Sequence, residues 1–110
     1  MDNIIEIMEA VGVPYAYDHF AEGESPSPPF SVFRMPESND FVADGINYYK
    51  KSRVNIELYT DKKDPVLEAK VEAVLDGHSV FYTKSEVWIS SERLYEVLYQ
   101  FELEVKYAEE

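Results

Sequence analysis

A strand pattern that leads closely into a helix pattern, between residues 52 and 77, constrains the fold of this chain most. Val54, Ile56 and Leu58 alternate with Asn, Glu and Tyr. A period of two places these three aliphatic side chains on one face of an extended segment. The segment is therefore predicted to be a strand with one buried face.

A helix is predicted directly after the polar residues 60–63. Asp64 can accept the free N–H groups of a first helical turn, and Pro65 needs no N–H there, so we expect the helix to begin at Pro65. Its apolar stripe comprises Leu67, Val71, Val74 and Leu75, and its water-facing side comprises Glu68, Lys70, Glu72 and Asp76. Gly77 is expected to end the helix in the left-handed conformation. Strand and helix must bury their apolar faces against each other, which predicts a helix layer on a sheet.

An earlier helix is predicted near the start of the chain. Asp2 or Asn3 can cap it, and Gly12 ends it. Its apolar stripe is expected to comprise Ile4, Ile5, Met8 and Val11. Residues 15–20 alternate only weakly, so they are either a short edge strand or an extended linker. Residues 22–29 contain three prolines, one glycine and two serines, which is typical of a surface loop.

Strands on both sides of a tight turn are predicted next. Residues 30–35 are rich in aromatic and β-branched side chains and lie between two prolines, which indicates a strand. Asp44-Gly45 is a strong hairpin signal, because both positions tolerate positive φ. Its arms would be residues 41–43 and a strand of unusual length at 46–59. A hairpin of that length must protrude beyond the sheet.

The end of the chain is predicted to be extended. Residues 79–83 are strand-like, and 87–89 either continue that strand or form a separate one. Residues 94–106 show the cleanest period of two in the chain, with one apolar face and one acidic face. The predicted fold is a single α+β domain, 1–110. It has a mainly antiparallel sheet of four to five strands, a long protruding β-hairpin and two helices packed on one face.

The composition excludes several classes of protein. The net charge is -12, from 22 acidic and 10 basic residues, so phosphate backbones are repelled and specific nucleic-acid binding is not expected. The chain has no cysteine, which excludes disulfides, thiolate metal sites and thiol nucleophiles, and suits an intracellular setting. No stretch is apolar enough for a membrane span, and the first ten residues lack a signal-peptide pattern, so no membrane contact is expected.

No catalytic, cofactor or metal site is predicted. His19 and His78 lie far apart in the chain, and neither has a second plausible ligand at helical spacing. Acidic pairs such as Asp61 and Asp64 arise by chance in so acidic a chain. Phosphate-binding and nucleophile motifs are missing from the sequence. The chain is therefore not expected to be an enzyme.

The predicted hairpin combines aromatic residues with a cluster of cations. Five of the ten cations lie between residues 50 and 63, and the chain has nine tyrosines. Tyrosine is favoured at interfaces, where part of its side chain is buried and part stays wet, but it is also a good strand former on an exposed face. We hypothesise a subunit or tube interface on the hairpin, comprising Phe41, Tyr48, Tyr49, Lys50, Lys51 and Arg53. An ordinary patchy surface is the alternative.

Three stretches carry a family resemblance: NDFVAD at 39–44, IELYTDKKD at 56–64 and LYEVLYQFELEV at 94–105. With these, and with VPYAY at 13–17, the chain resembles small proteins of prophage structural gene clusters in Gram-positive bacteria. These are similar to the tail terminator, or tail completion, proteins of long-tailed phages. None of the stretches is a chemical signature, so the likeness is one of overall pattern.

The resemblance implies a non-enzymatic virion protein. It implies a subunit of a hexameric ring at the head-proximal end of the tail tube, which ends tube polymerisation and joins tail to head. The implied partners are other copies of the chain, the major tail protein and a head-tail connector protein. The implied locations are the cytoplasm of the bacterial host during assembly and the virion tail.

Two alternatives stay open at the level of sequence. A head-tail connector or minor tail protein of the same gene cluster would have similar size and acidity. An acidic monomeric inhibitor, acting as a DNA mimic, would use its carboxylates to bind a basic protein. The oligomeric state distinguishes a ring-forming subunit from such an inhibitor.

Overall fold

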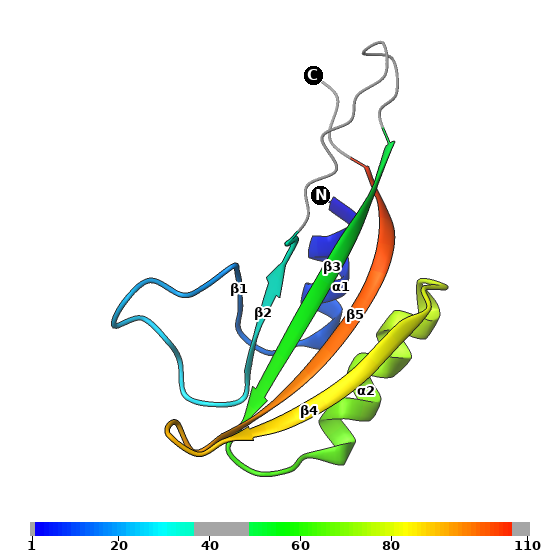
Figure 1. The fold of residues 1–110 in the computed structure, drawn as a ribbon. Coiled ribbons are helices and arrows are strands. Elements are labelled where there is room, and N and C mark those ends of the chain that lie inside the picture. The colour runs from blue at the N-terminus through cyan, green and yellow to red at the C-terminus, as the bar shows by residue number, and fades with distance from the viewer. Residues whose placement is uncertain (1, 37–48, 107–110) are drawn as a thin grey trace.

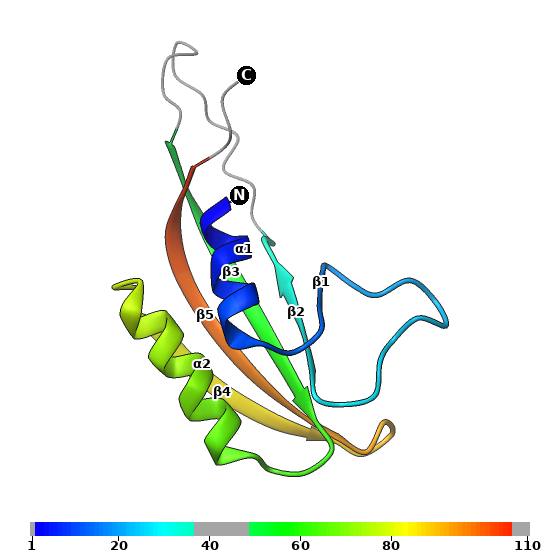
Figure 2. The ribbon, with the colours of Figure 1, turned by 180° about the vertical axis from the view of Figure 1, so that it is seen from behind.

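The fold is a five-stranded sheet with two helices, confirming the predicted α+β class (Figure 1). The computed structural model describes residues 2–36 and 49–106. The elements in chain order are α1 (Asp2–Val11), β1 (Tyr15–Tyr17), β2 (Phe30–Arg34), β3 (Tyr49–Thr60), α2 (Pro65–Gly77), β4 (Tyr82–Ile89) and β5 (Leu94–Lys106). The strand order in the sheet is β1-β2-β3-β5-β4. Figure 2 shows both helices on the same face of the sheet.

The sheet is antiparallel except at one edge. β1 pairs with β2 in parallel, whereas β2 with β3, β3 with β5 and β5 with β4 are antiparallel pairs. Residues 15–17 are thus a short edge strand, one of the two alternatives drawn from the sequence. The face covered by α1 and α2, which includes Ile56 of β3, is called the helix face. The opposite face, which includes Glu57, is called the open face.

The core lies between the helices and the helix face of β3 and β5. Its fully buried large side chains include Ile56, Leu58, Val71, Leu75 and Tyr99. α1 contributes Ile4, Ile7, Met8 and Val11 to this core. The predicted stripe of α1 is wrong at Ile5, whose side chain is 36% exposed, because Ile7 takes the buried position. At 3.6 residues per turn, positions 4, 7, 8 and 11 share a face and position 5 is rotated away from it.

α2 begins as predicted but ends differently. The Asp64 side chain accepts a hydrogen bond of 3.1 Å from the Leu67 N–H, and Pro65 occupies the first turn. The left-handed residue after the helix is Ser79, with φ of 60°, and not Gly77. The prediction that Glu68 faces water is also wrong, because only 4% of it is exposed. Glu68 instead forms ion pairs with Lys63 and Lys84, which lie outside the helix.

The long strands are close to their predicted extents. β4 is one continuous strand that includes residues 87–89, and it begins at Tyr82, later than predicted. β5 has the predicted bounds, with Val97, Tyr99 and Phe101 buried on the helix face. The predicted hairpin turn at Asp44-Gly45, and the arm before it, lie outside the described residues.

Candidate functional site

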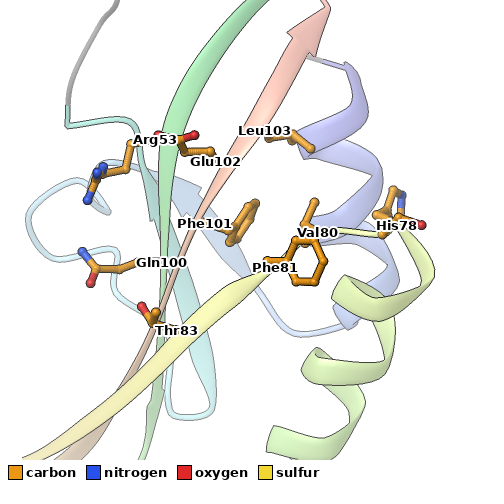
Figure 3. Close-up of a pocket in the computed structure, with 10 residues that line it drawn as sticks. Arg53, His78, Val80, Phe81, Thr83, Gln100, Phe101, Glu102 and Leu103 are labelled. Atoms are coloured by element: carbon orange, nitrogen blue, oxygen red, sulfur yellow. The ribbon is translucent and has the colours of Figure 1, made fainter.

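The candidate site is a pocket of about 550 Å³ at one edge of the sheet, where β4 starts beside β5 (Figure 3). β4 begins at Tyr82, opposite Phe101, whereas β5 continues to Lys106 with β3 as its partner. The pocket lies where the sheet loses its β4 strand. It is lined by apolar side chains, including Val80, Phe81 and Leu103, and by polar ones, including Arg53, Gln100 and Glu102.

The turn between α2 and β4 places an aromatic ring at this pocket. Ser79 reverses the chain in the left-handed conformation, and the Val80 N–H then donates to the Leu75 carbonyl at 3.4 Å. The next side chain, Phe81, is 95% exposed. The Phe81 ring forms part of the apolar side of the pocket.

The polar wall of the pocket belongs to the open face. Arg53 of β3 and Glu102 of β5 face each other across the strand pair, and both side chains are exposed. Figure 3 shows them together with Gln100 and Thr83, on the side away from Phe81. The pocket therefore offers a ring on one side and charged and amide groups on the other, which suits recognition of a polypeptide surface.

One of the six predicted interface residues can be placed with its side chain. Phe41 and Tyr48 lie outside the described residues. Tyr49, Lys50 and Lys51 begin β3, where their backbones pair with residues 104–106 of β5, and their side chains are not described. Arg53 lines the pocket. Four of the six residues therefore lie together in the first part of β3.

A second polar cluster joins α2 to β4 on the helix face. Glu68 of α2 lies 2.9 Å from Nζ of Lys63 and 2.9 Å from Nζ of Lys84. Lys84 also lies 2.7 Å from Glu72, and Lys63 contacts Glu86 of β4. Burial acts to raise the pKa of Glu68, but the hydrogen bonds from both lysines outweigh it and hold the pKa below the usual value for Glu. We call these five residues the α2–β4 ion cluster.

Sequence reasoning missed the α2–β4 ion cluster for a clear reason. Glu68 lies next to the apolar stripe in the helical projection, at three and seven residues from Val71 and Leu75. That position was the available signal that its carboxylate would need buried partners. Lys84, however, approaches it from a strand that follows the helix in the chain.

A third polar cluster lies on the open face. Glu57 is 9% exposed and accepts hydrogen bonds from Arg34 Nε at 3.0 Å and from the Tyr59 hydroxyl at 2.9 Å. Arg34 also donates to Asp18 at 3.2 Å. Burial, and next the charge of Glu57, raise the pKa of Glu96 on the neighbouring strand. A cleft of about 400 Å³ lies beside these residues, between the segment after β1 and the β4–β5 turn.

The two histidines have different partners. His19 is exposed and lies 2.8 Å from Asp18, whereas Nδ1 of His78 lies 3.0 Å from the Val74 carbonyl. Within residues 2–36 and 49–106, no group of three or more His, Cys, Asp or Glu side chains has a geometry that could hold a metal ion. Of the helices that the structure describes, none has the length and apolarity needed to cross a bilayer.

Comparison of the chain with protein-family models, curated proteins and solved structures finds no match. Its function must therefore be inferred from its own residues.

Proposed function

We propose that this chain is a non-enzymatic structural subunit of a phage or prophage tail, similar to a tail terminator. It forms a ring at the head-proximal end of the tail tube, ends tube polymerisation and joins tail to head. Its partners are other copies of itself, the major tail protein and a head-tail connector protein.

The observation that carries this proposal is the narrowing of the sheet at one end. β2 ends at Arg34, opposite Asn55, and β4 begins opposite Phe101. Past those residues, the described part of the sheet consists of β3 and β5 alone, paired from Arg53–Glu102 to Tyr49–Lys106 (Figure 1). A two-stranded extension presents backbone and side chains beyond the core, as a contact with a neighbouring subunit requires.

A cyclic ring uses a heterologous contact, in which one surface of a subunit meets a different surface of the next. The β3–β5 extension is suited to be one of these two surfaces, because in the described part of the sheet it is found at one end only.

The charge of the chain also fits a ring that DNA passes through. At a net charge of -12, the ring wall repels the phosphate backbone, so DNA moves past without being held. Lys50 and Lys51 of β3 would face an acidic flank of the next subunit, where charge complementarity directs encounter more than it adds affinity.

The experiment is a tube-capping assay with aromatic truncations. Tubes are grown from the major tail protein encoded in the same gene cluster, with and without this chain, and their lengths are measured by electron microscopy. Addition of the chain should stop growth and leave a density cap at one end of each tube. Uncapped tubes of unchanged length would refute the proposal.

Variants then test the predicted interface. Replacing Tyr48 and Tyr49 together with Ala should abolish capping while the circular dichroism spectrum stays native, because aromatic anchors dominate contact energies. The matched control is Tyr17→Ala, which removes an exposed tyrosine from β1 at the far edge of the sheet and should cap normally. Lys50→Glu with Lys51→Glu should slow capping most at low salt. Normal capping by the double tyrosine variant would place the ring contact elsewhere.

A further inference from the structure

β4 is a long strand at the edge of the sheet with one described partner. It pairs with β5 along its whole length, and within the part of the chain that the structure describes no strand pairs with its other side. Six of its eight residues are exposed. An unpaired strand edge presents a row of free N–H and C=O groups, which is a template for a strand from another chain.

This edge carries exposed apolar side chains beside its charged ones. Val87 and Trp88 are 52% and 45% exposed, and Phe81 precedes the strand. The strand also contains no proline or glycine that would interrupt pairing. A contact that removes these apolar side chains from water is therefore favourable.

We propose that two copies of this chain pair through β4, antiparallel, about a twofold axis that passes beside Ser85. The sequence around Ser85 is complementary to its own reverse. In this register Lys84 lies opposite Glu86 of the other copy, and Thr83 lies opposite its Val87. Tyr82 lies opposite Trp88 of the other copy in the same way. Opposite-charge, β-branched and aromatic pairs are the cross-strand pairs that stabilise antiparallel sheets.

The neighbouring registers are disfavoured by charge. A twofold axis perpendicular to the sheet keeps each residue on its own face. The allowed registers are therefore those in which the axis passes beside a residue, and the two nearest alternatives place it beside Lys84 or beside Glu86. One step in one direction places Lys84 opposite Lys84 of the other copy. One step in the other direction places Glu86 opposite Glu86. Like charges directly opposite each other are destabilising, so the register centred on Ser85 is selected.

The two charged residues keep exposed surface for this contact. The side chains of Lys84 and Glu86 are 36% and 41% exposed, although both belong to the α2–β4 ion cluster. Pairing would extend the cluster across the axis, from Glu72 through Lys84 to Glu86 of the other copy. The net charge of -12 on each copy opposes association at long range, and this repulsion is screened beyond about 8 Å at physiological ionic strength.

This dimer is independent of the proposed ring. An isologous contact is complete with two copies, whereas a cyclic ring needs a heterologous contact. The dimer is therefore a form of the free subunit. The test of the dimer uses variants on the β4 edge, and the test of the ring uses variants of residues 48–51 at the start of β3, so the two proposals can fail separately.

Cysteine cross-linking tests the register directly, because the chain has no cysteine of its own. In Ser85→Cys, the two introduced cysteines would face each other across the axis with their Cα atoms about 4.5–5.5 Å apart, which lies within the range of about 4.4–6.8 Å that a disulfide accepts. The matched controls are Thr83→Cys and Val87→Cys, which are exposed on the same face. Their thiols would lie about 13 Å from their own copies, four residues along the strand.

The expected result is rapid formation of a disulfide-linked dimer by Ser85→Cys under mild oxidation. Neither control alone should cross-link at that rate, but a mixture of Thr83→Cys and Val87→Cys should. Equal rates for Ser85→Cys and both controls would overturn the proposed register and, with it, the proposal.

Sedimentation equilibrium provides the second measurement. The wild-type chain should show a reversible monomer–dimer equilibrium at physiological salt. Ser85→Lys places two ammonium groups opposite each other and should weaken the dimer at least about tenfold. Ser91→Lys adds the same charge in the turn before β5 and should not. A wild-type chain that stays monomeric to millimolar concentration would overturn the proposal.

Discussion

Nζ of Lys84 lies 2.9 Å from Oε1 of Glu68, so a lysine of the edge strand β4 pairs with a buried carboxylate of α2. A buried carboxylate is costly unless charged or hydrogen-bonding partners surround it. Glu68 has one lysine partner that precedes α2 in the sequence, Lys63, and one that follows it, Lys84. The pair therefore ties β4 to α2.

Removal of the Lys84 ammonium should destabilise the fold. Lys84→Met keeps most of the aliphatic stem, and Glu68 keeps Lys63 as a partner, so we expect a loss of about 1–3 kcal/mol at pH 7. Urea denaturation measures the change. Lys62→Met, at an exposed position, is the control and should stay within about 0.5 kcal/mol of the wild type. Equal stability of the two variants would show that the pair contributes nothing.

The loss of stability caused by Lys84→Met should depend on pH. The folded chain holds the pKa of Glu68 below its usual value, so the stability that this group contributes is present above the unfolded pKa of about 4.3. It is lost as the pH falls through the folded pKa. The difference between wild type and Lys84→Met should therefore shrink below about pH 4.

Glu96→Gln should stabilise the fold at neutral pH. Burial and then the charge of Glu57 raise the pKa of Glu96, with partial relief from Arg34. A raised carboxyl pKa means that stability falls as the pH rises from the unfolded pKa of about 4.3 to the folded pKa, and the cost persists above both. The melting temperature of the variant should exceed that of the wild type at pH 7 and match it near pH 3.5. Glu92→Gln, in an exposed turn, is the control.

Two isoleucines of α1 provide a matched test of its orientation. Ile7 is fully buried, so Ile7→Ala should cost about 2–5 kcal/mol. Ile5→Ala should cost less than about 1 kcal/mol, since its side chain is partly exposed and Ala favours a helix. Chemical denaturation of both variants measures this difference. A larger loss for Ile5→Ala would restore the apolar stripe predicted from the sequence.

Duplex DNA should not bind. At physiological salt, a mobility-shift assay should show no complex at micromolar protein, because a chain with a net charge of -12 is repelled by phosphates. Binding at micromolar concentration that weakens steeply with salt would contradict the charge argument.

Local pattern predicted the elements whose signal is long and regular. β5 alternates over thirteen residues and α2 has both a cap and an apolar stripe, so the sequence predicts their positions closely. β1 has three residues, and its parallel pairing with β2 depends on a contact across the loop between them. Such a contact leaves little periodic trace in the sequence.

The candidate site was predicted less completely than the fold. Arg53 lines the pocket, as an exposed residue. The sequence did not indicate Phe81, because residues 79–83 read as a strand and the pattern does not show that Phe81 lies in the turn before it, with its ring exposed. Glu68 was misplaced because its lysine partners are set by tertiary contact. Phe41 and Tyr48 remain predictions.

The central position of β3 affects how the chain folds as it is made. Its longest partner, β5, follows α2 and β4 in the chain, so every residue pair between β3 and β5 closes a loop that contains both elements. Such non-local pairing slows folding. While the ribosome synthesises α2 and β4, the edge of β3 that later pairs with β5 has no strand partner. A nascent chain at that stage is therefore a natural client for chaperones that shield exposed strands.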